Sequence, residues 1–257
     1  MIIRAVKKPV ALLLILTFSV FLILLGIVKS TGAYAVYFNG TTRKLPIYAV
    51  QRDDNKISIS FDCAYGADST LKILDILDEY DVKTTFFCVQ FWVEKYPNVV
   101  KEIIKRGHEI GTHSKTHPKM STLKKEEIEE ELSSSIKAIE DLTEQKVELF
   151  RAPFGDYDNL LIEVASNFNL YTIQWDVDSI DWKDISAKQI TERVVKRTKS
   201  GSIILCHNNA LHTPEALPYV LSNLKEKGYQ FVKISELIYK ENYKINSFGV
   251  QIKNEQH

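Results

Sequence analysis

Short runs with the pattern of β-strands alternate with helix-like runs along most of the chain after residue 55. Residues 56–61 alternate polar and apolar side chains at period two, which predicts a strand. Ile73, Leu77 and Tyr80 then recur at helical spacing, after Asp68 and Ser69, either of which can cap a helix. The pattern predicts further strands at residues 84–89, 108–113, 148–151, 171–174, 202–206 and 230–234, and helices at 97–107, 122–142, 159–167, 187–199 and 214–227.

This alternation is typical of a parallel α/β fold, which is either a barrel or a doubly wound sheet. Repetition of the strand–helix unit about seven times favours a barrel of the (β/α) type, closed or incomplete. We therefore expect a folded domain at residues 56–240, preceded by a linker at 32–55 and followed by a short polar tail at 241–257.

The chain begins with a segment of a different kind, at residues 1–31. No charged side chain occurs from Pro9 to Val28, about the 20 residues that a helix needs to cross a bilayer. Because Arg4, Lys7 and Lys8 precede this run, the positive-inside rule predicts a transmembrane anchor with the rest of the chain outside the cytoplasm. The alternative is a signal peptide cleaved near residues 33–35, which have the sequence Ala-Tyr-Ala; the domain is then secreted.

Charge and cysteine content exclude two classes of protein. The 33 basic residues equal the 33 acidic ones, and the four cations of residues 1–31 leave the remainder with an excess of four acidic side chains. A nucleic-acid-binding face would need a cationic excess, so we expect no nucleic-acid partner. Three cysteines are too few for a disulfide scaffold. The oligomeric state is left open.

Candidate chemistry gathers where the predicted strands end, as active residues do in parallel α/β folds. The polar residues at these ends are Asp62, His113, His117, Arg151, Asp178, Asp181 and His207. His113 and His117, four residues apart, could converge on one metal ion, or they could be unrelated surface histidines. His207 could give a proton to a leaving amine near neutral pH, because the ordinary pKa of histidine is about 6.5.

Three further features have both a chemical and a structural interpretation. Asp62 could ligate a metal or act as a base, or it could pair with Arg151. Arg151 begins the rigid turn Arg-Ala-Pro-Phe-Gly. Trp175 and Trp182 lie near the carboxylates Asp178 and Asp181; aromatic faces beside acids commonly hold sugar rings, although a polar loop with two partly buried tryptophans would look the same.

Taken together and in order, these segments resemble the motifs of the polysaccharide deacetylases, the NodB-homology group or carbohydrate esterase family four. The segments are Ser60-Phe-Asp62, His113-Ser-Lys-Thr-His117, Arg151-Ala-Pro-Phe-Gly155, Asp178-Ser-Ile-Asp-Trp182 and Leu205-Cys-His207. The likeness extends from about Lys56 to Lys240. The predicted anchor and the form of the first motif look most like the sporulation-associated branch of the family.

The resemblance implies a distorted (β/α)7 barrel of the NodB type and roles for individual residues. His113 and His117 match the histidine ligands of a divalent metal, usually zinc. Asp62 matches the catalytic base, which Arg151 orients, and His207 matches the acid, which Asp181 tunes. The remaining matches concern substrate: the backbone N–H of Phe154 stabilises an oxyanion, and Trp182, Leu205 and Tyr65 contribute to the substrate pocket. The implied reaction hydrolyses an N-acetyl group on an amino sugar.

One position departs from the family pattern. Active members carry a second aspartate, the third metal ligand, where this chain has Cys63. A Cys63 thiolate could complete the site, since zinc accepts sulfur. Asp68 could supply the missing carboxylate instead, or the site could hold metal weakly or not at all. Cys63 could equally be a small buried residue at a strand end.

Two functions are therefore expected from the sequence. The first is a membrane-anchored, extracytoplasmic hydrolase that removes N-acetyl groups from peptidoglycan or another N-acetylated glycan. The second is a metal-poor, carbohydrate-binding pseudoenzyme that acts in cell-wall or spore morphogenesis. Retention of Asp62, Arg151, Asp181 and His207 favours the enzyme, because a pure binder has no need of an acid and a base.

Overall fold

The computed structural model describes residues 16–22 and 43–254. The chain divides into two units, Met1–Arg43 and Lys44–His257. In the first unit, residues 16–22 are helical, and the rest of the predicted anchor and of the predicted cleavage site lies outside the described residues. None of the helices within the described ranges has the length and apolar character that a membrane span requires.

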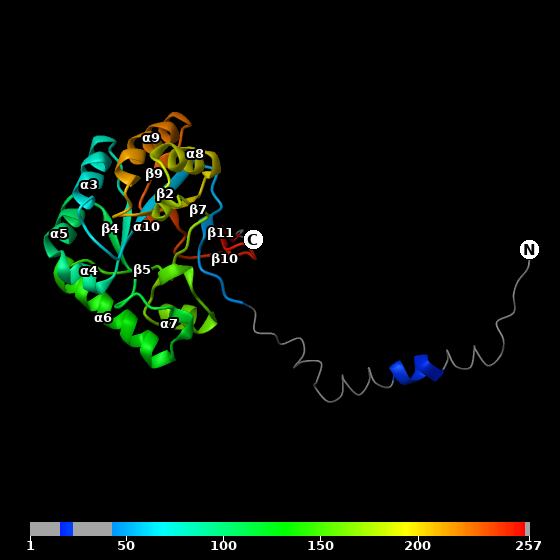
Figure 1. The fold of residues 1–257 in the computed structure, drawn as a ribbon. Helices are drawn as coiled ribbons and strands as arrows, with labels where there is room; N and C mark the ends of the chain where they lie inside the picture. The colour runs from blue at the N-terminus through cyan, green and yellow to red at the C-terminus, as the bar shows by residue number, and fades with distance from the viewer. Residues whose placement is uncertain (1–15, 23–42, 255–257) are drawn as a thin grey trace, which may run out of the picture. The chain divides into compact units, whose positions relative to one another are not determined.

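The second unit contains the elements labelled in Figure 1. The strands are β1 (Ala49–Val50), β2 (Lys56–Cys63), β3 (Thr85–Cys88), β4 (Glu109–Thr112), β5 (Leu149–Phe150), β6 (Tyr171–Thr172), β7 (Val177–Asp178), β8 (Ile203–His207), β9 (Gln230–Phe231), β10 (Tyr243–Ile245) and β11 (Val250–Lys253). The helices are α3 (Thr70–Glu79), α4 (Gln90–Lys95), α5 (Pro97–Lys105), α6 (Lys125–Thr143), α7 (Asn159–Asn167), α8 (Ala187–Arg197), α9 (Thr213–Glu226) and α10 (Ile234–Leu237).

The parallel α/β class predicted from the sequence is confirmed. The main sheet has the order β6-β5-β4-β3-β2-β8-β7, with β9 also paired to β2, and its neighbouring strands are parallel. The strands curl into a partial barrel with the helices outside them (Figure 1). A closed barrel is not formed, because within residues 43–254 no pairing joins the end strands β6 and β7.

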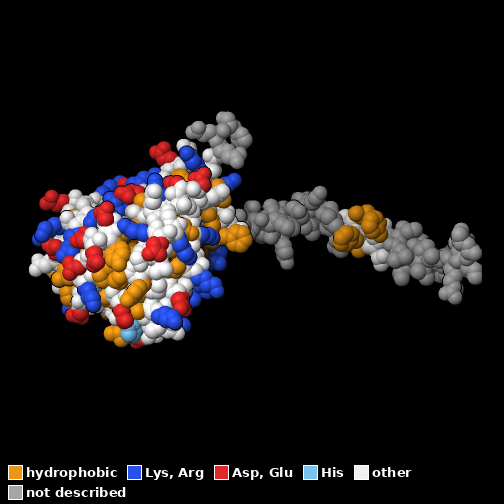
Figure 2. All heavy atoms as spheres, turned by 90° about the horizontal axis from the view of Figure 1, so that it is seen from above, with side chains coloured by type: hydrophobic (Ala, Val, Ile, Leu, Met, Phe, Trp, Pro, Cys, Tyr) orange, Lys and Arg blue, Asp and Glu red, His pale blue; other side chains and the backbone are white. Residues whose placement is uncertain are grey.

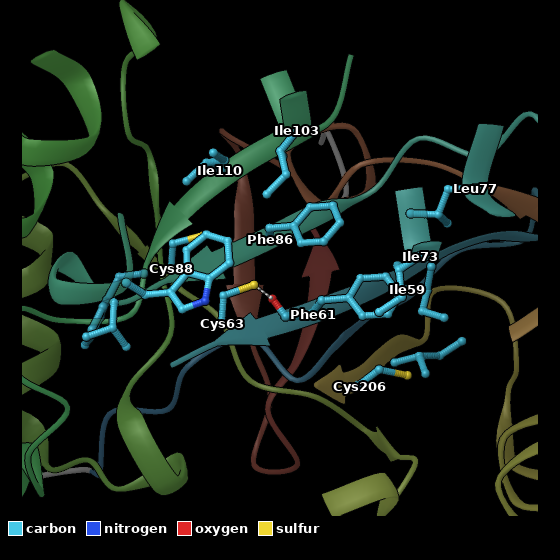
Figure 3. Packing of buried hydrophobic residues seen from close by; sticks show 14 of the residues in the cluster. Ile59, Phe61, Cys63, Ile73, Leu77, Phe86, Cys88, Ile103, Ile110 and Cys206 are labelled. Carbon is cyan, nitrogen blue, oxygen red and sulfur yellow. Dashed lines mark hydrogen bonds between the residues drawn. The ribbon is translucent and has the colours of Figure 1, made fainter. Parts of the chain in front are cut away.

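Alternation along β2 separates two environments. Ile57, Ile59 and Phe61 belong to the hydrophobic cluster between the sheet and the helices. Ser58, Ser60 and Asp62 are also buried, but they point to the other side, the inside of the curl, because successive side chains of a strand face opposite ways. Figure 3 shows Phe61 packed near Phe86 and the side chains of α3. The buried polar side chains of β2 thus all point to the inside of the curl, where they can contribute to a site.

The folded unit extends beyond the predicted domain at both ends. Residues expected in the linker form β1, and residues expected in the polar tail form β10 and β11. These strands make a second sheet of order β1-β11-β10, in which Ala49 pairs with Val250. The side chains of Ile47 and Val50 are buried in a cluster with Phe87 and Leu149. Periodicity misses this arrangement because it depends on contacts between distant parts of the chain.

Candidate active site

A pocket of about 500 Å³ opens at the carboxyl ends of the central strands. Its lining brings together residues from most of the motifs that the sequence singles out: Asp62, Ala64, Tyr65, His113, His117, Phe154, Trp175, Asp178, Trp182, Leu205, His207 and Asn209. These positions span nearly 150 residues of sequence, and they meet because parallel strands place their carboxyl ends at one edge of the sheet.

Asp62 lies at the bottom of the pocket and is held by a buried cation. The Arg151 Nη1 atom donates to Asp62 Oδ1 at 2.7 Å, and Arg151 Nη2 donates to Ser60 Oγ at 2.9 Å. Burial would raise the pKa of Asp62, but the positive charge of Arg151, with smaller contributions from His113 and His207, holds that pKa below its usual value. Asp62 is therefore an ionised carboxylate able to accept a proton.

His207 lies in the same pocket and is paired with a different carboxylate. Its Nδ1 is 2.7 Å from Asp181 Oδ1, while its backbone N–H donates to Asp181 Oδ2 at 2.8 Å. Asp181 is fully buried and also accepts from Thr213 Oγ1. Burial would lower the pKa of His207, but the hydrogen bond and charge of Asp181 outweigh it and raise the pKa above 6.5. His207 thus carries a proton at neutral pH more readily than an exposed histidine.

The two histidines of the second motif converge at the opposite wall. The rings of His113 and His117 are 4.9 Å apart. Because the backbone oxygen of Arg151 can only accept, the 2.7 Å contact with His113 Nδ1 fixes the proton on that nitrogen, and the unprotonated Nε2 lies 3.5 Å from Asp62 Oδ2. Burial lowers the pKa of His113, and it lowers that of His117 to about 4, so both rings are neutral at physiological pH.

Neither candidate for the third ligand joins these histidines. The Cys63 side chain has no exposed surface and does not line the pocket; it packs on the helix side of β2 with Phe61 and Cys88 (Figure 3). Strand alternation explains this placement, because Cys63 is one residue beyond the inward-facing Asp62. Burial also raises the pKa of the Cys63 thiol well above its usual value, which disfavours a thiolate. Asp68 is exposed, in the turn before α3, and does not line the pocket.

The donor set therefore does not fit the three-ligand metal centre that the resemblance implies. Two imidazoles are present, but the Asp62 carboxylate that faces His113 is engaged by Arg151, and neither Cys63 nor Asp68 lines the pocket. In the part of the chain that the structure describes, no group of three or more His, Cys, Asp and Glu side chains is arranged to hold a metal ion. The chemistry derived below accordingly uses the side chains alone.

The rim of the pocket is aromatic and exposed. Tyr65, Phe154 and Trp182 expose 62%, 65% and 56% of their surface, which is unusual for side chains of this size. Phe154 has a left-handed backbone (φ 60°), and its ring lies edge-on to His117 at 4.6 Å. The next residue must be glycine: Gly155 has φ +68°, and a Cβ there would lie 3.1 Å from the indole of Trp175. Leu205 adds an apolar wall.

Two residues of the site are not indicated by the sequence pattern. Asn209 lines the pocket, two positions after His207, where its amide offers a donor and an acceptor. Glu131, on α6, does not line the pocket but supports the loop between His113 and His117. Its carboxylate accepts hydrogen bonds from the backbone N–H groups of Lys115 and Thr116, each at 2.8 Å. The regular helical stripe of α6 gives no sign of this contact.

One face of the protein carries charges of both signs. Figure 2 shows lysine, arginine, aspartate and glutamate side chains interspersed over the face that it presents. The pocket itself contains carboxylates and no exposed lysine or arginine.

The chain is similar in sequence to known proteins over most of its folded unit. The sequence model of a family described as polysaccharide deacetylase matches residues 49–173. A peptidoglycan-N-acetylglucosamine deacetylase of Bacillus cereus is 34% identical over 196 residues, which cover 74% of this chain and 92% of that protein. The uncharacterised protein YlxY of Bacillus subtilis is also 34% identical, and this chain spans only 60% of its length.

Similarity to solved structures extends to a protein without activity. BA3943 of Bacillus anthracis, described as a pseudoenzyme of carbohydrate esterase family 4, superimposes with a TM-score of 0.73 and 36% identity, over 75% of this chain and 68% of that one. A mutant of the same protein, described as having restored enzymatic activity, matches equally well at 38% identity. On its sequence, fold and ordered motifs, the chain belongs to the polysaccharide deacetylases, the NodB-homology hydrolases of carbohydrate esterase family 4.

Proposed function

We propose that this protein hydrolyses the N-acetyl group of amino sugars in peptidoglycan. One observation carries the proposal: a carboxylate whose pKa is lowered, Asp62, and a histidine whose pKa is raised, His207, line the same pocket. Two groups whose environments move their pKa values in these directions are the base and acid of a hydrolase. Each is also fixed by a buried partner, Arg151 for Asp62 and Asp181 for His207.

The two groups account for every proton of the reaction. Asp62 accepts a proton from water as the water oxygen forms a bond with the acetyl carbon. The resulting tetrahedral intermediate carries negative charge on the former carbonyl oxygen, for which the backbone N–H of Phe154 is the proposed donor. His207, protonated and held through Nδ1 by Asp181, gives a proton to the nitrogen as the carbon–nitrogen bond breaks. The products are acetate and a free amino sugar, and proton exchange with water restores both groups.

The rim of the pocket suits a sugar chain. Tyr65, Phe154 and Trp182 are exposed, and aromatic faces bury the apolar faces of sugar rings. Asn209 and Asp178 can bond to hydroxyl groups of the glycan. Peptidoglycan is the proposed glycan because the related Bacillus cereus protein is named for its deacetylation.

A second candidate function is glycan binding with little or no turnover. The specific observation in its favour is Cys63, which lies in the core where active members of the family supply a metal ligand. The similarity to BA3943, a described pseudoenzyme, supports the same interpretation. The protein would then act in assembly of the cell wall or the spore, through the aromatic rim alone.

One experiment separates the two functions. The full-length chain is incubated with N-acetylglucosamine oligomers and with peptidoglycan, with and without added Zn²⁺, and acetate release is measured beside glycan binding. Acetate release that is lost in His207→Ala, with binding retained, supports the hydrolase. Binding without acetate release above background under any metal condition rejects the hydrolase and supports the binding protein. A wild-type protein that neither releases acetate nor binds glycan rejects both candidate functions.

We further propose that the domain acts outside the cytoplasm, tethered by residues 1–31. The proposal rests on the uncharged run from Pro9 to Val28 and the cations before it. Protease added to intact cells should cleave the domain, and the full-length chain should stay with the membrane fraction. A chain protected from protease in intact cells would reject this location, and a shortened chain in the medium would indicate a cleaved signal peptide.

A further inference from the structure

Arg151 is an unusually buried cation. The side chain has no exposed surface, although it is among the largest in the core. Its Nη atoms donate to Asp62, to Ser60 and, at 3.4 Å, to the backbone oxygen of Gln174, while its Nε atom has no hydrogen-bond partner. A guanidinium removed from water in this way needs compensation beyond one carboxylate.

Aromatic rings near the guanidinium supply part of that compensation. The Arg151 Cζ atom is 4.1 Å from the centre of the Phe87 ring and 5.6 Å from that of Trp175. A cation over an aromatic face is attracted by the ring quadrupole, and the attraction is strongest where water is absent. Phe87 is fully buried and does not line the pocket, so it contacts Arg151 but not a substrate.

The register of the sheet explains how Phe87 comes to lie there. Asp62 pairs with Phe87 across β2 and β3, and Phe87 pairs with Gly111 across β3 and β4. The three residues therefore stand side by side and face the inside of the curl. A Cβ at Gly111 would lie only 2.8 Å from two carbons of the Phe87 ring, so the missing side chain gives the ring its room. Arg151 can then reach Asp62 across the ring face.

We propose that Phe87 is a positioning residue. Its ring holds the Arg151 guanidinium in the plane in which the guanidinium orients the Asp62 carboxylate. Gly111 takes part by leaving space for the ring. The proposal rests on the proposed function for its effect on turnover, because Asp62 is the base there. The contact between Phe87 and Arg151 itself does not depend on that function.

The test compares two phenylalanines that differ only in the face they occupy. Phe87→Leu removes the ring beside Arg151, whereas Phe86→Leu removes an equally buried ring that stacks on Phe61 at 5.2 Å, on the helix side of the sheet. Nitrogen-15 NMR of the guanidinium follows rotation of the Arg151 Nη groups. We expect rotation to accelerate about tenfold in Phe87→Leu and to stay unchanged in Phe86→Leu. For acetate release, kcat should fall about tenfold in Phe87→Leu with KM nearly constant.

A second variant keeps the test decisive if Phe87→Leu fails to fold. Trifluorophenylalanine in place of Phe87 keeps the shape of the ring and weakens its negative face, so the same change in Arg151 rotation should follow without loss of packing. Unchanged rotation in this variant, or equal rotation in Phe87→Leu and Phe86→Leu, would overturn the proposal. If the wild type releases no acetate, the hydrolase proposal fails while the NMR comparison still decides the role of Phe87.

Discussion

Asp62 and Cys63 are consecutive in β2, yet their side chains lie on opposite sides of the sheet. The Asp62 carboxylate faces the pocket and bonds to Arg151, whereas the Cys63 thiol is buried with Phe61 and Cys88 among apolar side chains. Both proposed functions depend on this pair, because the family resemblance assigns the base to the position of Asp62 and a metal ligand to the position of Cys63.

Replacing Cys63 by aspartate should restore metal binding at a cost in stability, because residue 63 ends β2 and its carboxylate must turn from the helix side toward the histidines to bind a metal. In Cys63→Asp without metal, we expect the free energy of unfolding to fall by about 1–3 kcal/mol, because a carboxylate enters an apolar environment. Zn²⁺ should raise the melting temperature of Cys63→Asp but not that of the wild type or of Cys63→Ser, which adds a polar atom without a charge. Stoichiometric zinc in the wild type, at an affinity equal to that of Cys63→Asp, would show that residue 63 does not limit the site.

Acetate release should depend on the protonation of His207. The pKa of Asp62 is lowered, so the base is ionised down to acidic pH; the pKa of His207 is raised, so the acid stays protonated past pH 6.5. Activity should therefore decline as the pH rises through the raised pKa. Asp181→Asn removes the charge that raises it, and the alkaline decline should shift to lower pH. A pH–rate profile that is identical in Asp181→Asn would exclude His207 as the acid.

Stability should fall in mild acid because of buried neutral histidines. Burial lowers the pKa of His117 to about 4, so between pH 6.5 and 4 the unfolded chain binds a proton that the folded protein does not. The contribution of His117 to the free energy of unfolding is fully present above pH 6.5. It is lost as the pH falls through this window, and the loss is about 1–2 kcal/mol for a partly exposed group. Urea unfolding in EDTA should show a smaller loss in His117→Gln, while His212→Gln, outside the pocket, should behave as the wild type. Equal acid sensitivity in all three proteins would contradict the assignment.

Glu131 should support the loop that presents the histidines. Ser114 and His117 have left-handed backbones, with φ of 72° and 61°, which favour glycine rather than these residues. The Glu131 carboxylate holds the loop between them through Lys115 and Thr116. Glu131→Ala should lower the free energy of unfolding by about 1–2 kcal/mol and weaken glycan binding.

The neighbouring Glu130 provides the control for this prediction. Its carboxylate bonds only to the Lys115 ammonium, at an exposed position, and such ion pairs contribute little. Glu130→Ala should therefore change stability by less than about 0.5 kcal/mol and leave glycan binding intact. Equal effects of the two variants on binding would show that the loop does not need the Glu131 contact.

Most of the architecture was predictable because local patterns decide it. The alternation of Ile57, Ile59 and Phe61 identifies β2 and places Asp62 at its end, and the same logic locates the other strand ends that meet in the pocket. The same alternation predicts where the Cys63 side chain lies. Cys63 is two residues after Phe61, so its side chain points to the same side of the sheet, into the core. The interpretation of Cys63 as a small buried residue at a strand end is confirmed.

The features that the sequence could not predict depend on contacts between residues that are far apart in the chain. The two-residue strand β7 has no periodicity to detect, and the contact of Phe87 with Arg151 joins residues 64 positions apart. The pairing of Ala49 with Val250 joins nearly the two ends of the domain. Such contacts are set by how the sheet curls, and a local pattern carries no information about that.

The pairing of β1 with β11 determines where this domain can be cut for laboratory work. Tyr48 and Gln51 bond through their backbones to Gly249 and Gln251. Ile47 and Ala49 also form bridges to Ile173 and Ser202. A fragment limited to residues 56–240 would lose both strands and uncover the apolar cluster that Ile47 and Val50 help to bury. Recombinant versions should therefore start no later than Lys44 and continue through residue 254, and removal of either end by proteolysis should leave the strand at the other end without its pairing partner.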